Sequence, residues 1–250
     1  MTARRLSTRI HIGTSGWYYD HWRGRFYPAS MSSDQFLSHY ARHFQTVEIN
    51  NTFYQLPSAE TFVAWRDGTP PRFLFACKAS RYITHMKKLA DPARTTERFF
   101  EAIQILGSKL GPVLFQLPPR WHVNADRLRA FLRTLPKSPR FAFEFRDPSW
   151  FAPEIYAALA EHHAAFCIYD LAGLQSPIET TTDFVYIRLH GPGGPYRGKY
   201  DDRALRAWAR RCRAWIKAGK DVYCYFDNDE RGYAVQDALE LQQMLVPQRD

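Results

Sequence analysis

The chain has 250 residues, of which 45% are hydrophobic and 16% aromatic. This length and apolar content allow a sizeable core and exclude a disordered chain. The 34 Lys and Arg residues outnumber the 25 Asp and Glu residues, which gives a formal net charge of +9. Such a charge suggests an acidic partner, either a phosphate compound or a nucleic acid.

The four cysteines form no Cys-x-x-Cys pair, so neither a disulfide framework nor a zinc site is indicated, and we expect buried thiols. Residues 1–9 are positively charged but are followed by no apolar stretch, as a signal peptide would require. No window approaches the roughly 18 apolar residues of a membrane-spanning helix. We therefore expect a cytoplasmic protein with no membrane partner.

Short runs rich in Val, Ile, Phe and Tyr predict buried strands. They cover residues 10–14, 46–50, 73–78, 113–117, 141–145, 165–169, 184–189 and 222–226. Helical periodicity lies between most of them, over residues 34–44, 95–107, 126–135 and 202–218. The last of these helices has an apolar stripe with Leu205, Trp208 and Cys212, and its opposite face is basic.

Alternating strands and helices indicate parallel strands joined by crossovers, and this chain length fits a (β/α)8 barrel. We predict an α/β, TIM-barrel-like fold as a single domain over residues 1–250. The sixth crossover, residues 171–183, has no amphipathic helix, and we expect a loop with a short helical turn there. An open doubly wound sheet is the alternative, but no Gly-x-Gly-x-x-Gly follows a strand.

Three predicted strands carry polar residues two positions apart between apolar neighbours. The pairs are Glu48 and Asn50, Glu144 and Arg146, and Arg188 and His190. Period two places both members of a pair on one face of a strand. A charge that faces a closed interior is costly unless it is paired, so these residues indicate a candidate active site.

Polar residues also end most of the other predicted strands, where the catalytic groups of such barrels lie. The candidate catalytic residues are Glu48, Glu144, His190 and Asp227. The candidate substrate-binding residues are Trp17, Asn50, Lys78, Gln116, Arg146, Asp170, Arg188, Tyr196 and Asn228. We expect the three strand pairs to form one ring that Lys78, Gln116, Asp170 and Asp227 complete. A structural ion-pair network is the alternative to an active site.

The basic members of this set favour an anion site. Lys78, Arg146 and Arg188 could clamp a phosphate or carboxylate, with Arg providing a bidentate grip. A glutamate of the set then acts as general base, and His190 as acid or base near neutral pH. Lys78 could instead form a Schiff base, but neighbouring carboxylates favour its charged form, and we favour the anion contact.

Two loops could add to the site. Residues 190–200, after the seventh strand, are rich in glycine and proline, and could bind phosphate or close as a mobile lid. The aromatic residues between Trp17 and Tyr27, after the first strand, could stack on a sugar or a base. Core packing is the alternative for these aromatic side chains.

No cofactor is predicted. Residues 227–232 resemble the start of a calcium loop, but Arg231 and Ala238 stand where the fifth and twelfth positions need ligands. A divalent metal at the strand ends is disfavoured by the neighbouring arginines. Its ligands would be Glu144, Asp170, His190 and Asp227.

Several segments, distributed nearly end to end, resemble the YecE-like family, also called domain of unknown function seventy-two. They are IGTSGWYYDHWRGRFYP (12–28), FQTVEINNTFYQLPS (44–58), FACKASRYITHMKKL (75–89), GPVLFQLPP (111–119), FEFRDPSW (143–150), VYIRLHGP (185–192) and YFDNDERGYAVQDA (225–238). The resemblance implies a TIM-barrel-like fold and a site at the strand ends, with no established activity. The family often has Asn at the position of Asp227, which implies that this carboxylate is dispensable.

Several functions stay open. The first is an enzyme using general acid/base chemistry on a small anionic or phosphorylated substrate, sugar-like or nucleotide-like. The second is a nucleic-acid-binding protein that uses the basic helix 202–218 and exposed aromatic residues. A metal-dependent hydrolase or isomerase is a further alternative. A glycosidase using Glu48 and Glu144 is disfavoured, because the fourth and seventh strands do not end in carboxylates.

Overall fold

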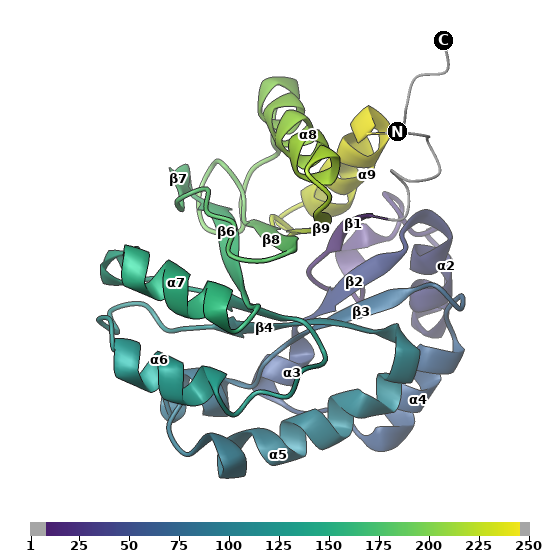
Figure 1. Ribbon diagram of the computed structural model, residues 1–250. Helices are drawn as coiled ribbons and strands as arrows, with labels where there is room; N and C mark the ends of the chain where they lie inside the picture. The colour runs from purple at the N-terminus through teal and green to yellow at the C-terminus, as the bar shows by residue number, and fades with distance from the viewer. Residues whose placement is uncertain (1–8, 246–250) are drawn as a thin grey trace. The chain divides into compact units, whose positions relative to one another are not determined.

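The computed structural model describes residues 9–245, which form two compact units (Figure 1). The first unit comprises the described parts of Met1–Val47, Ile168–Ser176 and Asp183–Asp250, and the second comprises Glu48–Cys167 and Pro177–Thr182. Most of the segment 1–9, interpreted above as lacking a signal peptide, lies outside the described residues. The single domain over residues 1–250 stays a prediction.

Parallel strands form the centre of the first unit. They are β1 (Ile10–Thr14), β8 (Phe184–Leu189) and β9 (Asp221–Phe226). Cys224 of β9 pairs with Ile12 on one side and Ile187 on the other, so a row of small and apolar side chains crosses the sheet. At Gly13 a Cβ would lie 2.3 Å from the carbonyl oxygen of Thr46, which explains the glycine.

Helices cover the strands of the first unit. They are η1 (Asp20–Trp22), η2 (Ser33–Gln35), α2 (Phe36–His43), α8 (Asp202–Lys217) and α9 (Tyr233–Leu245). Helices α8 and α9 pack side by side (Figure 1). Helix α8 buries its predicted apolar stripe, and Asp201 caps it by accepting a hydrogen bond from Ala204 N at 2.7 Å.

Parallel strands also form the centre of the second unit. They are β3 (Leu74–Lys78), β4 (Leu110–Gln116) and β5 (Phe141–Glu144). The core between them and their helices is aromatic: the rings of Phe115 and Phe143 stack with centroids 5.1 Å apart, and Phe131 meets Phe115 edge-on at 5.0 Å. Large aromatic side chains of this kind supply much of the apolar area that a core buries.

The helices of the second unit are short. They are α3 (Asn51–Tyr54), α4 (Ala59–Asp67), η3 (Tyr82–Met86), α5 (Pro92–Ile103), η4 (Gln104–Lys109), α6 (Ala125–Leu132), η5 (Pro148–Trp150) and α7 (Pro153–Glu161). Helices α6 and α7 pack against each other (Figure 1). Segment η3 is a π-helix, in which Lys87 N–H donates to the carbonyl of Tyr82 at 2.9 Å, five residues earlier.

Strands β2 (Thr46–Ile49) and β6 (Ala165–Leu171) each contribute to both units. The strand order is β1-β9-β8-β6-β5-β4-β3-β2. Every predicted strand is present, with ends shifted by a few residues, and strands alternate with helices as expected. The α/β, TIM-barrel-like fold class is therefore confirmed.

The sixth crossover is irregular, as predicted, but the short helical turn expected in it is wrong. Instead, the two-residue strand β7 (Leu174–Gln175) pairs antiparallel with the end of β6. The turn between them consists of Ala172 and Gly173, which have φ values of 56° and 77°. Two successive positive φ angles are those of a type I′ hairpin turn, whose twist matches that of the strands it joins.

The predicted burial of the cysteines and the predicted lack of a membrane-spanning helix can both be compared with the described residues. Cys77, Cys167, Cys212 and Cys224 are all buried thiols that form no disulfide, as predicted. Over residues 9–245 no helix has both the length and the apolar character needed to cross a membrane.

Candidate functional site

In the second unit, the strand register puts three of the candidate residues on one face of the sheet. Lys78 pairs with Leu114, and Gln116, two residues further along β4, pairs with Glu144. Paired residues on neighbouring strands share a face, as do residues two apart on one strand. The side chains of Lys78, Gln116 and Glu144 therefore project from the same face, and all three residues are buried.

Glu144 is fully buried and forms an ion pair with Arg146. Arg146 Nε donates a hydrogen bond to Glu144 Oε1, and the thiol of Cys167 lies 3.9 Å from Glu144 Oε2. A buried carboxylate is costly unless a cation balances it, and Arg146 supplies that cation. Two residues that the sequence separates by two positions thus act as a pair.

The Lys78 ammonium group lies over an aromatic ring. Its Nζ lies 4.3 Å from the centroid of the Phe53 ring, which follows β2 on helix α3. The hydroxyl of Thr52 donates to the carbonyl oxygen of Lys78 at 2.7 Å and so holds α3 at the end of β3. The face of an aromatic ring attracts a cation, so this position favours the ammonium form that an anion contact needs.

His85 is a candidate that the sequence interpretation missed. Its ring lies on the π-helix η3, 5.0 Å from the Phe53 ring and nearly perpendicular to it. Burial and the charges of Lys78, Arg81 and Arg146 together lower the pKa of His85 to about 4, while Glu144 acts in the opposite direction. A signal was present: His85 lies in a basic segment directly after the third strand.

We call Lys78, His85, Glu144 and Arg146 the Glu144 cluster, because the other three charges all act on the His85 ring. Three further candidates belong to the same unit. Glu48 is fully buried on β2, and the buried Oδ1 of Asn50 has no hydrogen-bond partner. Gln116 Nε2 donates to the carbonyl of Leu117 at 3.0 Å. That these three join the Glu144 cluster stays a prediction.

The first unit holds a second cluster, Arg188, His190 and Asp227, which we call the Asp227 cluster. Asp227 Oδ2 lies 3.0 Å from both Arg188 Nη2 and His190 Nδ1, and Arg188 Nη1 lies 3.4 Å from His190 Nε2. Arginine can only donate, so Nε2 of His190 accepts the hydrogen bond from Arg188. Nδ1 then carries the proton and donates a hydrogen bond to Asp227. Arg188 and His190 are almost fully buried.

Asp229 adjoins the Asp227 cluster and was also missed. Its Oδ1 accepts a hydrogen bond from Trp22 Nε1 at 2.6 Å, and its Oδ2 lies 2.9 Å from His21 Nε2. Burial raises the pKa of Asp229 to about 6; the Trp22 hydrogen bond opposes this shift and the charge of Asp227 adds to it. The contact with Trp22 joins segments 207 residues apart.

The aromatic residues after β1 mostly pack into the core. Trp22 and Tyr27 are buried, and the Tyr27 ring stacks on Phe36 with centroids 4.0 Å apart. Trp17 is buried too, and its carbonyl accepts the hydroxyl of Tyr27 at 2.6 Å. Core packing therefore describes these residues, and substrate binding by Trp17 stays a prediction.

The loop that follows β8 folds back on itself. Gly191 has a φ of 107°, and a Cβ there would lie 2.2 Å from the carbonyl oxygen of Arg197. Tyr196, at the half-exposed tip, also has a positive φ, and its ring lies 5.4 Å from the His190 ring and perpendicular to it. The loop therefore carries Tyr196 to the Asp227 cluster.

A buried carboxylate, Asp237, anchors the far end of this loop. Its Oδ2 accepts hydrogen bonds from Tyr200 N at 3.1 Å and from Asn228 Nδ2 at 2.7 Å. Asn228 Nδ2 also donates to the carbonyl of Gly198 at 2.8 Å, so Asn228 supports the loop. Burial raises the pKa of Asp237 to about 6. The sequence interpretation missed Asp237; the feature that could have indicated it is a carboxylate on the apolar stripe of α9.

The near end of the loop is anchored through Tyr200 and Asp170. The hydroxyl of Tyr200 accepts a hydrogen bond from Gly191 N at 3.0 Å. Burial raises the pKa of Asp170, and a hydrogen bond with the Tyr200 side chain opposes that shift. Asp170 therefore belongs with the loop anchors in the first unit. The single ring of strand-end residues stays a prediction.

A divalent metal held by Glu144, Asp170, His190 and Asp227 was disfavoured from the sequence, and its absence stays a prediction. Within the described part of the chain, no group of three or more His, Cys, Asp or Glu side chains is arranged to hold a metal ion. In the Asp227 cluster, His190 and Asp227 bond to each other and to Arg188.

Comparison with known proteins gives a consistent family. Residues 11–250 match the family described as "Protein of unknown function DUF72". The chain is similar to the UPF0759 protein YunF of Bacillus subtilis, with 27% identity over 94% of each chain. It is 32% identical to the UPF0759 protein YecE of Escherichia coli over 57% of this chain and 50% of that protein.

Solved structures show the same likeness. A DUF72 family protein from Thermotoga maritima, 30% identical, superimposes with a TM-score of 0.86 over 94% of this chain and 98% of that one. A second, from Enterococcus faecalis, is 20% identical and gives a TM-score of 0.80 over 96% of this chain and 97% of that one. The expected resemblance is therefore confirmed for the fold.

Proposed function

This chain belongs to the DUF72 family, and we propose that it is an enzyme that acts by general acid/base chemistry on a small anionic substrate. The proposed substrate class is a phosphorylated sugar-like or nucleotide-like compound. One observation carries the proposal: Lys78 Nζ and the His85 ring both lie against the ring of Phe53, and the charges of Lys78, Arg81 and Arg146 act on His85 together with its burial. Positive charge in a partly desolvated position attracts an anion more strongly than the same charge does in water.

In this proposal, Lys78 and Arg146 hold the anion and Glu144 exchanges the proton. Lys78 contributes a point charge fixed above the Phe53 ring. The planar guanidinium of Arg146 has five N–H donors in a fork, which suits it to contact a carboxylate and a phosphate together. When an anion approaches Arg146, the ion pair with Glu144 is shared, and Glu144 becomes more able to accept a proton.

Binding of inorganic phosphate, measured by calorimetry, tests the anion site. Lys78→Met keeps the apolar stem on Phe53 and removes the charge, and we expect it to weaken phosphate binding at least about tenfold, or about 1.4 kcal/mol. Lys87→Met is the matched control, because Lys87 also lies over an aromatic ring, that of Tyr82, and is exposed. Equal binding by the two variants would contradict the anion site.

Turnover tests the role of Glu144. A set of phosphorylated sugars and nucleotides is screened with the wild-type protein, and the substrate that reacts is then given to Glu144→Gln. Loss of a general base lowers kcat by about 100-fold to 10,000-fold. A Glu144→Gln variant that retains kcat would show that the base is another residue.

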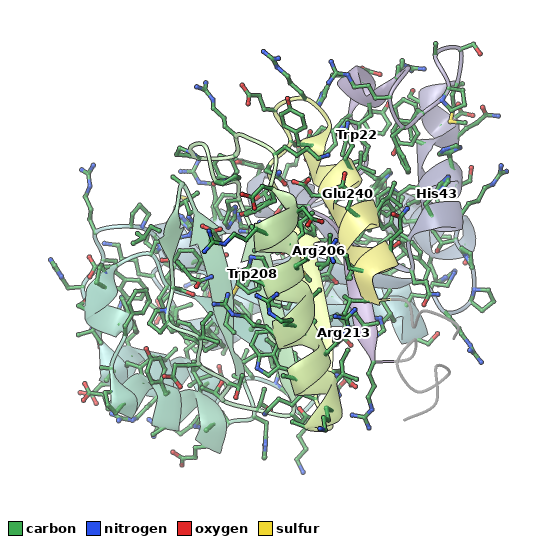
Figure 2. The ribbon with its side chains drawn as sticks, turned by 90° about the horizontal axis from the view of Figure 1, so that it is seen from above. Trp22, His43, Arg206, Trp208, Arg213 and Glu240 are labelled. Carbon is green, nitrogen blue, oxygen red and sulfur yellow. The ribbon has the colours of Figure 1, made fainter. Side chains whose placement is uncertain are left out.

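The nucleic-acid alternative rested on the basic face of α8, and the contacts of that helix favour the anion site over it. Arg206 pairs with Asp202 on the same helix at 2.6 Å, and Arg213 donates to a backbone carbonyl at the end of α9. Arg211 lies over the ring of Trp208 at 4.8 Å. Figure 2 shows Arg206, Trp208 and Arg213 along α8, with Glu240 on the neighbouring helix α9.

A further inference from the structure

The hydrogen bonds of Thr84 favour a proton on Nδ1 of the His85 ring. His85 Nδ1 lies 2.9 Å from Thr84 Oγ1, and the Thr84 hydroxyl donates to the carbonyl oxygen of Ser80 at 3.3 Å. A hydroxyl has a single proton to donate, so Thr84 receives a hydrogen bond from Nδ1–H of the neutral imidazole. Nε2 then carries the lone pair, and it is the atom that can gain a proton.

The groups around His85 come from three elements. Lys78 ends β3, Arg81 precedes the π-helix on which His85 lies, and Glu144 and Arg146 lie at the end of β5. Phe53 of α3 contacts the His85 ring and also lies beneath Lys78 Nζ. In the protein without ligand, burial of the ring and the repulsion of these cations together favour the neutral imidazole, and Glu144 opposes them.

We propose that His85 takes up one proton from solvent when an anion binds beside Lys78 and Arg146, and then donates a hydrogen bond to that anion from Nε2. The bound anion offsets the repulsion of the neighbouring cations and pairs with the ring itself, and the new pair compensates for the burial of the imidazolium. His85 is in this way a binding residue whose charge appears only in the complex. The proposal rests on the anion site described under the proposed function.

The thermodynamic linkage between proton uptake and anion binding gives the expected pH dependence of the affinity. Between the pKa of the free His85 and its pKa in the complex, one proton is bound per anion, so affinity rises about tenfold for each unit by which the pH falls. Sulfate is the appropriate probe, because it carries the same charge as a phosphate dianion but does not titrate in this range. Proton uptake is measured by titration calorimetry near pH 5.5 in buffers of different ionisation enthalpy.

We expect sulfate to bind wild-type protein with uptake of close to one proton, and His85→Gln to bind it with none. His122→Gln is the matched control, because His122 belongs to the same unit and its side chain is 85% exposed; it retains the uptake. An NMR titration of the wild-type imidazole gives the same answer without a variant: the His85 pKa rises from about 4 to about 6.5 or higher in saturating sulfate, as uptake of close to one proton at pH 5.5 requires.

Sulfate binding without proton uptake, or with uptake that survives in His85→Gln, overturns the role of His85 and leaves the anion site standing. Failure of sulfate to bind at all overturns the anion site, and the role of His85 with it. The two failures are therefore distinguishable in one set of titrations.

Discussion

The Glu144 cluster and the Asp227 cluster are built from the same residue types at strand ends, yet their charges are arranged differently. In the Asp227 cluster one carboxylate accepts from both Arg188 and His190, and each cation or donor has a partner within the cluster. In the Glu144 cluster Lys78 and Arg146, and Arg81 beside the cluster, act on the imidazole of His85 together with its burial. A balanced cluster, in which each charge pairs with another, depends on every member for the stability of the fold, whereas an imidazole among cations is suited to a charged ligand.

The two units also titrate in opposite directions. In the first unit, burial raises the pKa of the carboxyls of Asp229 and Asp237 to about 6. In the second unit, burial and neighbouring cations lower the pKa of His85 to about 4. Burial is the largest cause in both units, because it favours the neutral form of an acid and of a base alike, and at His85 the neighbouring cations add to it.

The largest effect is expected from breaking the balanced cluster. Arg188→Met leaves Asp227 and His190 without their cation in a buried position, and we expect it to lower the free energy of unfolding by about 3–5 kcal/mol. Urea denaturation followed by tryptophan fluorescence measures this. Arg206→Met, which removes an exposed pair on α8, is the control and leaves stability unchanged. A loss at Arg188 no larger than the control would show that the cluster is not balanced.

The second effect is the pH dependence of stability through Asp237. Its pKa is raised in the folded protein, so its contribution is present below pH 4 and is lost as the pH rises through about 6. At about 1.4 kcal/mol per pKa unit, the loss amounts to about 2–3 kcal/mol by pH 7. Asp237→Asn keeps an oxygen that accepts from Tyr200 and Asn228, and abolishes this dependence. An unchanged pH profile in Asp237→Asn would contradict it.

The third effect has the opposite sign and belongs to the second unit. The pKa of His85 is lowered in the folded protein, so the neutral ring contributes stability at neutral pH that is lost as the pH falls from about 6.5 towards 4. Chemical denaturation of His85→Gln between those pH values should show a flatter profile than the wild type. The effect is smaller than that of Asp237, since His85 is only half buried and solvent screens it. A profile as steep as that of the wild type counts against the assignment.

The smallest effects come from the helix caps, one in each unit. Asp201 accepts from Ala204 N at 2.7 Å, and Ser58 accepts from Thr61 N at 3.3 Å. We expect Asp201→Ala to cost about 1 kcal/mol and Ser58→Ala about 0.5 kcal/mol, because the longer hydrogen bond is weaker. Thermal denaturation measures both. The reverse order would mean that cap geometry does not set the cost in these helices.

Much of this architecture could be predicted from the sequence because it follows local patterns. Apolar runs revealed the strands, and period two correctly brought together Glu144 with Arg146 and Arg188 with His190. The hairpin at β7 was not predictable from periodicity, since its strand has two residues and depends on the turn. A π-helix likewise leaves no repeating pattern, and His85 was missed for that reason.

The other omissions come from long-range contacts. Asp229 gains its partner Trp22 from the opposite end of the chain, and Asp237 is buried by segments that contain Tyr200 and Asn228. Composition cannot reveal that such an aspartate is buried. An aspartate between Ala234 and Leu241 on an apolar stripe is the one local indication.

The π-helix Tyr82–Met86 makes the length of this segment as decisive as its side chains. Its hydrogen bond spans one residue more than an α-helical turn, and each residue of a helix rotates the chain by about 100°. Loss of a single codon between Arg81 and Lys87 would therefore turn His85 away from Phe53 while strand β3 stayed intact. Relatives in which this segment is one residue shorter or longer should present another side chain beside Lys78, whatever their overall sequence identity.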